Sequence, residues 1–183
     1  MKKARLQELY QQNIRPELQK TLGLDNVMKV PRITKIVLNA GVGKEAVADS
    51  KVVSQVAEVL TRIAGQKAVR TLARKSIAGF KLREGMPLGA MVTLRGKRMY
   101  DFLDKFINLA LPGIRDFQGV GIRFDRRGNY NLGIREWVIF PEVEYDVAQK
   151  AHGLNVTICT SSATDEHAFE LLKSFGMPFR KQP

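Results

Sequence analysis

The sequence contains a single cysteine, Cys159, and no long apolar run in its 183 residues. One cysteine excludes an internal disulfide and a cysteine-based zinc site, which suits the reducing cytosol. Because no stretch of about 18 apolar residues occurs, we expect no membrane-spanning helix. Residues 1–12, MKKARLQELYQQ, are basic but contain no apolar core, so we expect no secretory signal.

Residues suited to metal binding or nucleophilic catalysis are also scarce. The two histidines, His152 and His167, lie in no ligand-spaced cluster, so we expect no metal ion. The G-x-S-x-G pattern of a nucleophilic serine is absent. We therefore expect a protein without a cofactor and without enzyme activity.

The segment Gly41–Lys44, GVGK, lies between a predicted strand and a predicted helix, as phosphate-binding loops do. That pattern needs a glycine where this chain has Leu38 and a serine or threonine where it has Glu45. The alternative function, a nucleotide-binding enzyme using this turn, is therefore disfavoured, and a tight turn explains the glycines.

Positive charge is abundant and unevenly distributed. Lysine and arginine number 30 against 18 acidic residues, which gives a net charge of +12. Residues 62–98 contain ten of these bases and one acid, so this segment alone contributes +9. Such a segment favours a polyanionic partner, and nucleic acid is the first candidate. A membrane surface is the second, but the strongest amphipathic helix, 50–64, has few basic residues.

Apolar periodicity predicts an α+β fold with a single mixed β-sheet, helices packed on one face and an open polar face. We expect one domain over residues 1–183, with a long basic loop at about 73–87. The predicted strands cover 33–39, 67–72, 88–95, 137–140 and 154–160. The predicted helices cover 3–12, 50–64, 98–110 and 165–175.

Polar side chains alternate with apolar ones along the predicted strands, so the two kinds should lie on opposite faces. If helices cover the apolar face, the other face presents groups that contact phosphates, 2′-hydroxyls and base edges in structured RNA. The sequence assigns to this open face Lys35, Asn39, Gln66, Arg70, Thr93 and Arg95.

Three carboxylates, Glu142, Glu144 and Asp146, occupy alternating positions in FPEVEYD. In an extended segment they would share one face. That face is either simply solvated or a contact for a basic protein, and the sequence leaves both interpretations open.

Five segments carry a family resemblance that extends over almost the whole chain. They are VPRITKIVLNAGVG, GQKAVRTLARKSIAGFKLREGMPLGAMVTLRG, RDFQGV, FDRRGNYNLGIRE and FPEVEYD. In this order they resemble the bacterial large-subunit ribosomal protein five family, which binds 5S rRNA.

The resemblance implies a cytoplasmic ribosomal protein that anchors 5S rRNA in the central protuberance, beside 23S rRNA and other large-subunit proteins. It implies 5S rRNA contacts at Asn39, Gln66 and Thr93. It also implies that a basic loop contacts peptidyl-site tRNA and that the acidic stretch or RDFQGV bridges to small-subunit protein thirteen. The corresponding loop cations are Arg74, Lys75, Lys81 and Arg83.

Overall fold

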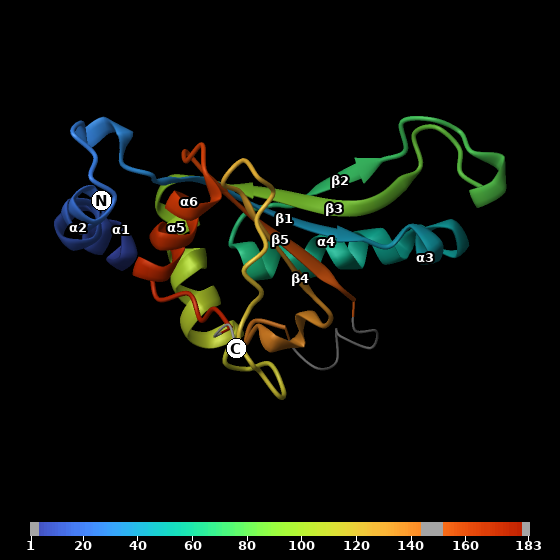
Figure 1. Ribbon diagram of the computed structural model, residues 1–183. Helices are drawn as coiled ribbons and strands as arrows, with labels where there is room; N and C mark the ends of the chain where they lie inside the picture. Colours follow the sequence, from blue (N-terminus) through green and yellow to red (C-terminus); the bar gives the residue numbers. More distant parts are fainter. Residues whose placement is uncertain (1–3, 144–151, 181–183) are drawn as a thin grey trace. The chain divides into compact units, whose positions relative to one another are not determined.

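The computed structural model describes residues 4–143 and 152–180 (Figure 1). The chain comprises two compact units. Unit 1 is formed by Met1–Ile36, Leu94–Leu132 and Thr157–Pro183, and unit 2 by Val37–Thr93 and Gly133–Val156. Each boundary between the two units falls within a β-strand rather than in a loop. The expectation of one RNA-binding domain over residues 1–183 stays a prediction.

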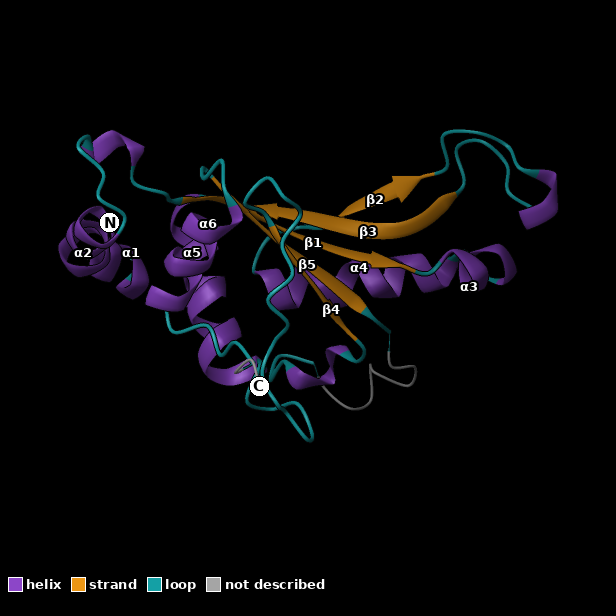
Figure 2. Cartoon of the chain, viewed as in Figure 1, coloured by secondary structure: helices purple, strands orange, loops and turns teal. Residues whose placement is uncertain are grey.

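A single five-stranded sheet accompanies the helices, which confirms the α+β class (Figure 2). The strand order is β2-β3-β1-β5-β4. The strands are β1 (Ile33–Gly41), β2 (Val69–Leu72), β3 (Pro87–Leu94), β4 (Tyr130–Ile134) and β5 (Leu154–Thr160). They run antiparallel, which differs from the expected mixed sheet. A hairpin needs no crossover helix, and β3 follows β2 directly in this way.

In unit 2, the amphipathic helix α4 (Lys51–Ala64) supplies most of the helical core. It follows the short helix α3 (Gly43–Ala48), which the sequence analysis did not predict. Buried α4 side chains recur at helical spacing and include Val53, Val56, Val59, Leu60 and Ile63. Figure 1 shows α4 lying along one side of β1 and β3.

The hairpin of β2 and β3 extends from the sheet of unit 2 (Figure 1). Its pairing is regular from Val69↔Met91 to Thr71↔Gly89, but the next pair is Leu72↔Pro87. Leu88 is therefore an extra residue on β3, and the register shifts at this point as in a β-bulge.

Unit 1 contains the helices α1 (Arg5–Leu9), α2 (Arg15–Thr21), α5 (Gly96–Lys105) and α6 (Asp165–Ser174). A π-helical turn (Tyr10–Ile14) joins α1 to α2, and another (Phe106–Ala110) continues α5. The Arg5 guanidinium binds the Asp104 carboxylate between α1 and α5, which lowers the pKa of Asp104. No helix among residues 4–143 and 152–180 is long and apolar enough to cross a membrane.

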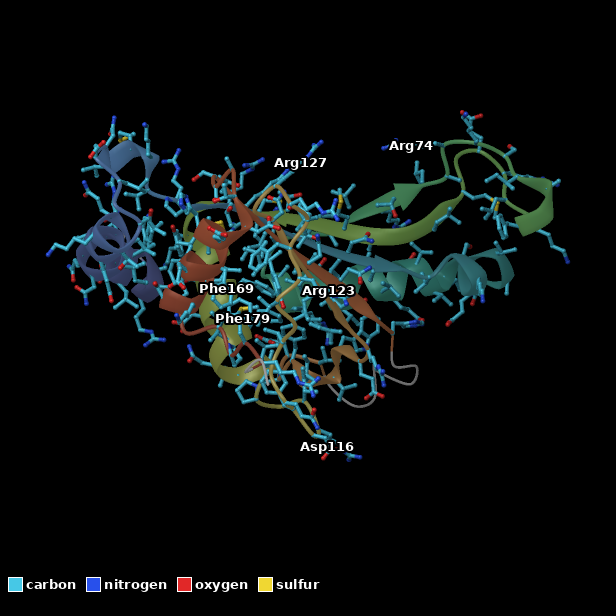
Figure 3. All side chains as sticks on the ribbon, viewed as in Figure 1. Arg74, Asp116, Arg123, Arg127, Phe169 and Phe179 are labelled. Carbon is cyan, nitrogen blue, oxygen red and sulfur yellow. The ribbon has the colours of Figure 1, made fainter. Side chains whose placement is uncertain are left out.

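Unit 1 also contains an aromatic cluster. Phe169 of α6 and Phe179 have ring centroids 4.8 Å apart, and Figure 3 shows the two side by side. Phe124 and Tyr130 complete the cluster, with the Tyr130 ring edge-on to Phe179. The Tyr130 hydroxyl donates to the Gly121 carbonyl, and burial raises the pKa of Tyr130 to about 12.

The predicted strand at 137–140 is wrong, because Trp137–Ile139 forms a 3₁₀ turn. The Phe140 amide donates to the Trp137 carbonyl at 3.0 Å. Trp137 and Phe140 are both buried, whereas the residues between them are only half-buried. A spacing of three residues suits a 3₁₀ turn, in which such side chains eclipse, and a four-residue apolar run does not distinguish it from a strand.

Replacement of Gly89 by alanine should destabilise the protein by about 1–3 kcal/mol. A Cβ at this position would collide with the Ala40 carbonyl oxygen and lie 3.2 Å from Thr71 Oγ1. Chemical denaturation measures the effect. The control is Gly41→Ala, because a Cβ there would meet nothing within 4 Å. Equal stability of the two variants would contradict a steric role for Gly89.

Candidate nucleic-acid interface

Burial alternates along β1 and β3 in unit 2 as the sequence predicts. Leu38 and Ala40 are buried on β1, and Ala90 and Val92 are buried on β3. Their neighbours in the alternation, Asn39 on β1 and Thr93 on β3, are partly exposed. Asn39 and Thr93 therefore have the parity opposite to the buried positions, although the exposed set also includes apolar Met91.

Arg70 does not share this parity. In the antiparallel register Arg70 pairs with Ala90, so both side chains point to the same side of the sheet. Val69 and Thr71, which pair with Met91 and Gly89, take the other side. The predicted side of Arg70 is therefore wrong, because the alternation of side chains along β1 does not continue through the turn after α4 into β2. Arg70 is nevertheless exposed, since β2 is an edge strand.

Gln66 lies in that turn rather than on a strand. Gly65 ends α4 with a φ of 62°, and the Thr61 hydroxyl accepts a hydrogen bond from the Ala68 amide at 3.0 Å. The Gln66 side-chain amide donates to the Thr93 carbonyl at 3.1 Å. The structure thus brings Gln66 beside Thr93 through a hydrogen bond that the sequence did not predict.

Lys35 and Arg95 belong to unit 1, unlike the other predicted sheet residues. Lys35 is half-buried on β1. Arg95 follows β3, is exposed and stands at the N-cap of α5. It therefore lies outside the sheet to which the sequence analysis assigned it.

Two polar side chains in unit 1, one on β4 and one on β5, were not included in the polar face predicted from sequence. The Thr157 hydroxyl donates to Asn131 Oδ1 at 2.7 Å. On β5, Leu154, Val156 and Ile158 are buried while Thr157 is not, so LNVTICT contains the alternation that could have identified it. From sequence, that alternation predicts the strand 154–160.

All four cations of the predicted tRNA-contacting loop are exposed: Arg74, Lys75, Lys81 and Arg83. Arg74 lies where β2 ends and the loop begins (Figure 3). Phe80 at the tip is 71% exposed, so the loop presents an aromatic ring as well as positive charge.

This loop has hydrogen-bonded structure, which its weak periodicity did not predict. Near its base the Ala73 amide donates to the Met86 carbonyl at 2.8 Å, and Ile77 and Leu82 pair through both backbone groups. Ala78–Phe80 forms a 3₁₀ turn, followed by Lys81 with a φ of 54°. The loop is therefore a narrow extension of the hairpin.

Of the predicted acidic patch, only Glu142 lies within the described residues, where it is half-buried. Glu144 and Asp146 lie outside them. The Val143 amide donates to the Phe140 carbonyl at 3.1 Å, which makes this part of the stretch a turn rather than a strand. In unit 1, Val120 at the end of RDFQGV exchanges backbone hydrogen bonds with Pro178 and Arg180, while Asp116 lies on an exposed loop (Figure 3).

The Gly41–Lys44 segment does not form a phosphate cradle. The Val42 amide already donates to the Leu88 carbonyl at 3.0 Å, and α3 follows directly. The predicted tight turn is present, since β1 ends at Gly41 and α3 begins at Gly43, but neither glycine has a positive φ or a close neighbour that requires glycine. Within the described part of the chain, no group of three metal-ligating side chains occurs.

Unit 1 contains an arginine-rich turn, FDRRGN, where the glycine-rich sequence RRGNYN predicts a turn between extended segments. The Asp125 carboxylate accepts from the Arg127 and Asn129 amides, and Asp165 accepts from the Arg126 and Gly128 amides. These bonds hold the backbone of the turn, and the side chains of Arg126 and Arg127 are both exposed. Figure 3 shows Arg127 at this turn.

Comparison with known proteins identifies the family. Residues 26–83 match the family described as ribosomal protein L5, and residues 87–179 match the model of that ribosomal family's C-terminus. The chain is 58% identical to large ribosomal subunit protein uL5 of Geobacter sulfurreducens, over 97% of this chain and 99% of that protein. The uL5 proteins of Paraburkholderia phymatum and Burkholderia mallei are 57% and 56% identical over the same shares.

These matches confirm the predicted resemblance and with it the expectation of a non-enzymatic protein. Together the two matched segments cover more than half of the chain. The chain belongs to the ribosomal protein L5 family of the large ribosomal subunit.

Proposed function

We propose that the protein binds 5S rRNA in the cytoplasmic large ribosomal subunit, next to 23S rRNA and neighbouring proteins. Membership of the ribosomal protein L5 family carries this proposal. Asn39 and Thr93 support it because both are partly exposed on strands whose alternate residues are buried. The Gln66 amide, held at the Thr93 carbonyl, lies beside this pair. Amide and hydroxyl groups suit the 2′-hydroxyls and base edges of an RNA minor groove.

The hairpin loop contacts peptidyl-site tRNA in this proposal. Its four exposed cations can neutralise backbone phosphates, and the local hydrogen bonds reduce the ordering that binding requires. Phe80 offers a ring on which a base or ribose can pack.

The acidic stretch around Glu142 contacts the basic small-subunit protein thirteen in this proposal. The formal charges of residues 99–183 sum to −1, although the whole chain has a net charge of +12. Carboxylates repel phosphates, so an acidic stretch suits a basic protein partner better than RNA. The RDFQGV segment of unit 1 is a second candidate for this bridge.

Replacement of Asn39, Gln66 or Thr93 by alanine should weaken 5S rRNA binding by about 0.5–1.5 kcal/mol each, because one hydrogen bond is lost. Gel shifts against 5S rRNA and an unrelated RNA of equal length measure the change. Asn13→Ala and Gln12→Ala are matched controls, since both residues are exposed in unit 1. Wild-type affinity in all three variants, with intact folding, would refute the 5S rRNA contacts.

Replacement of Lys75 and Lys81 by glutamine should weaken tRNA binding to the peptidyl site of reconstituted ribosomes. Thermal stability should change by less than about 0.5 kcal/mol, because both side chains are exposed. Binding of 5S rRNA should stay near wild type. The control removes equal charge at Lys20 and Lys51. A larger loss of 5S rRNA binding than of tRNA binding would contradict this assignment.

Charge reversal of Glu142 and Glu144 to lysine should slow subunit association, most strongly at low salt, where screening is weakest. Binding of 5S rRNA should be unchanged or slightly tighter. Light scattering follows association, and Glu8→Lys with Glu17→Lys supplies the same charge change on exposed α1 and α2 positions. Normal subunit association combined with poor 5S rRNA binding would show that the acidic stretch contacts RNA rather than the small-subunit protein.

A further inference from the structure

A histidine, a carboxylate and the single tryptophan of the chain come together in unit 2, and no part of the proposed function uses them. His152 precedes β5, Glu45 lies in α3, and Trp137 begins the 3₁₀ turn Trp137–Ile139. The His152 Nδ1 atom lies 3.8 Å from Glu45 Oε1, and the His152 and Trp137 ring centroids are 4.9 Å apart. Three segments that are distant in sequence therefore meet at one imidazole.

The surroundings of His152 make its contact with Glu45 sensitive to charge. Only 11% of the His152 side chain is exposed, whereas the Glu45 side chain is 41% exposed. The Trp137 ring stands at 71° to the imidazole and is itself buried. A carboxylate at this distance attracts an imidazolium strongly where water is partly excluded, but it has little effect on a neutral ring. The strength of the contact therefore follows the proton on His152.

The separation of the two atoms supports this interpretation. At 3.8 Å, Nδ1 of His152 and Oε1 of Glu45 are too far apart for an ordinary hydrogen bond, which spans about 2.7–3.2 Å. A neutral imidazole is thus held only loosely by this carboxylate, whereas an imidazolium can form a shorter, charge-assisted bond with it. Histidine is the side chain whose charge ordinarily changes between about pH 5 and 8. A change of pH within that range can therefore switch the contact between two strengths.

Glu45 is the charged group that faces His152 most closely. Among residues 4–143 and 152–180, no other carboxylate forms an ion pair with His152. The charged neighbours on the elements packed here are Lys44, beside Glu45 on α3, and Arg135 and Glu136, which precede the 3₁₀ turn. All three of these side chains are exposed, so water and salt screen their effect on the imidazole. The charge on His152 therefore acts mainly on Glu45.

Backbone hydrogen bonds connect His152 to the start of the acidic stretch. The Trp137 amide donates to the His152 carbonyl at 3.3 Å, and the Phe140 amide donates to the Trp137 carbonyl at 3.0 Å. The Val143 amide in turn donates to the Phe140 carbonyl, which encloses Glu142 in the last of these bonds. Within the described part of the chain, the buried Trp137 Nε1 has no hydrogen-bond acceptor. The turn is therefore held by packing and by a series of backbone bonds that begins at His152.

We propose that His152 and Glu45 form a pH-sensitive latch that fastens α3 to the Trp137–Ile139 turn when the imidazole is protonated. In the closed state the ion pair adds to the bonds that hold the turn and the residues leading to Glu142. In the open state backbone bonds and packing hold the turn alone. The stabilisation is present at low pH and is lost as the pH rises and the imidazole loses its proton. The latch involves neither RNA nor a partner protein, so it does not depend on the proposed function.

The first test uses Trp137 as a probe, because the chain has no other tryptophan and an imidazolium quenches the emission of an adjacent indole. The emission of the full chain is measured from about pH 8.5 to about pH 5. We expect a one-proton loss of emission as the pH falls, and we expect His152→Gln to abolish it. The matched control, His167→Gln, removes the other histidine of the chain, on α6 in unit 1, and should retain the loss. Circular dichroism shows whether both variants fold.

The second test is a double-mutant cycle of Glu45→Gln and His152→Gln, in which chemical denaturation gives the unfolding equilibrium constant at about pH 5.5 and about pH 8. We expect the two side chains to be coupled by about threefold at the lower pH, as for a partly exposed ion pair. At the higher pH we expect no coupling, because the neutral imidazole is not attracted to the carboxylate.

Four results overturn the proposal. They are a wild-type emission that does not change with pH, a change that survives in His152→Gln, a change that is lost in His167→Gln, and a coupling that is absent or equal at both pH values. If His152→Gln does not fold, the wild-type protein and His167→Gln still decide whether His152 is the group that titrates beside Trp137. None of these measurements uses RNA or ribosomes, so a failure of the proposed function leaves them unaffected.

Discussion

The burial of alternate β1 and β3 residues, with α4 along one side of these strands, is the constraint on which unit 2 depends. An amphipathic helix covers one face of a sheet, so alternate strand residues must be apolar and the residues between them are free to vary. Leu38, Ala40, Ala90 and Val92 meet the first requirement. Asn39 and Thr93 occupy the positions between the buried ones. Polar side chains can therefore stand there without removing any apolar residue from the core.

The same constraint explains why part of the candidate site was predictable. A period of two fixes which side of a strand each residue takes, so Asn39 and Thr93 could be assigned from sequence to the side opposite the buried residues. The periodicity of α4 and the exposed cations of the basic loop were predictable for similar reasons. Each of these properties depends on residues close together in the chain.

Other features depend on pairing or packing between distant segments and could not be predicted. The side taken by Arg70 follows from its partner Ala90, and the place of Gln66 follows from a bond to the Thr93 carbonyl. One cavity of unit 1 is lined by residues as distant in sequence as Arg15, Arg95 and His167. Trp137–Ile139 forms a 3₁₀ turn because two side chains three residues apart are both buried, and a short apolar run does not reveal that spacing.

The register shift at Leu72 has a consequence for how the hairpin can evolve. One extra residue, Leu88, absorbs the change of pairing before the loop begins. Residues beyond it no longer inherit their orientation from the sheet, since the alternation restarts from Leu72↔Pro87. Selection can therefore change the length and the charged surface of the loop while Asn39 on β1 and Thr93 on β3 keep their orientation, so the loop and the sheet can diversify at different rates.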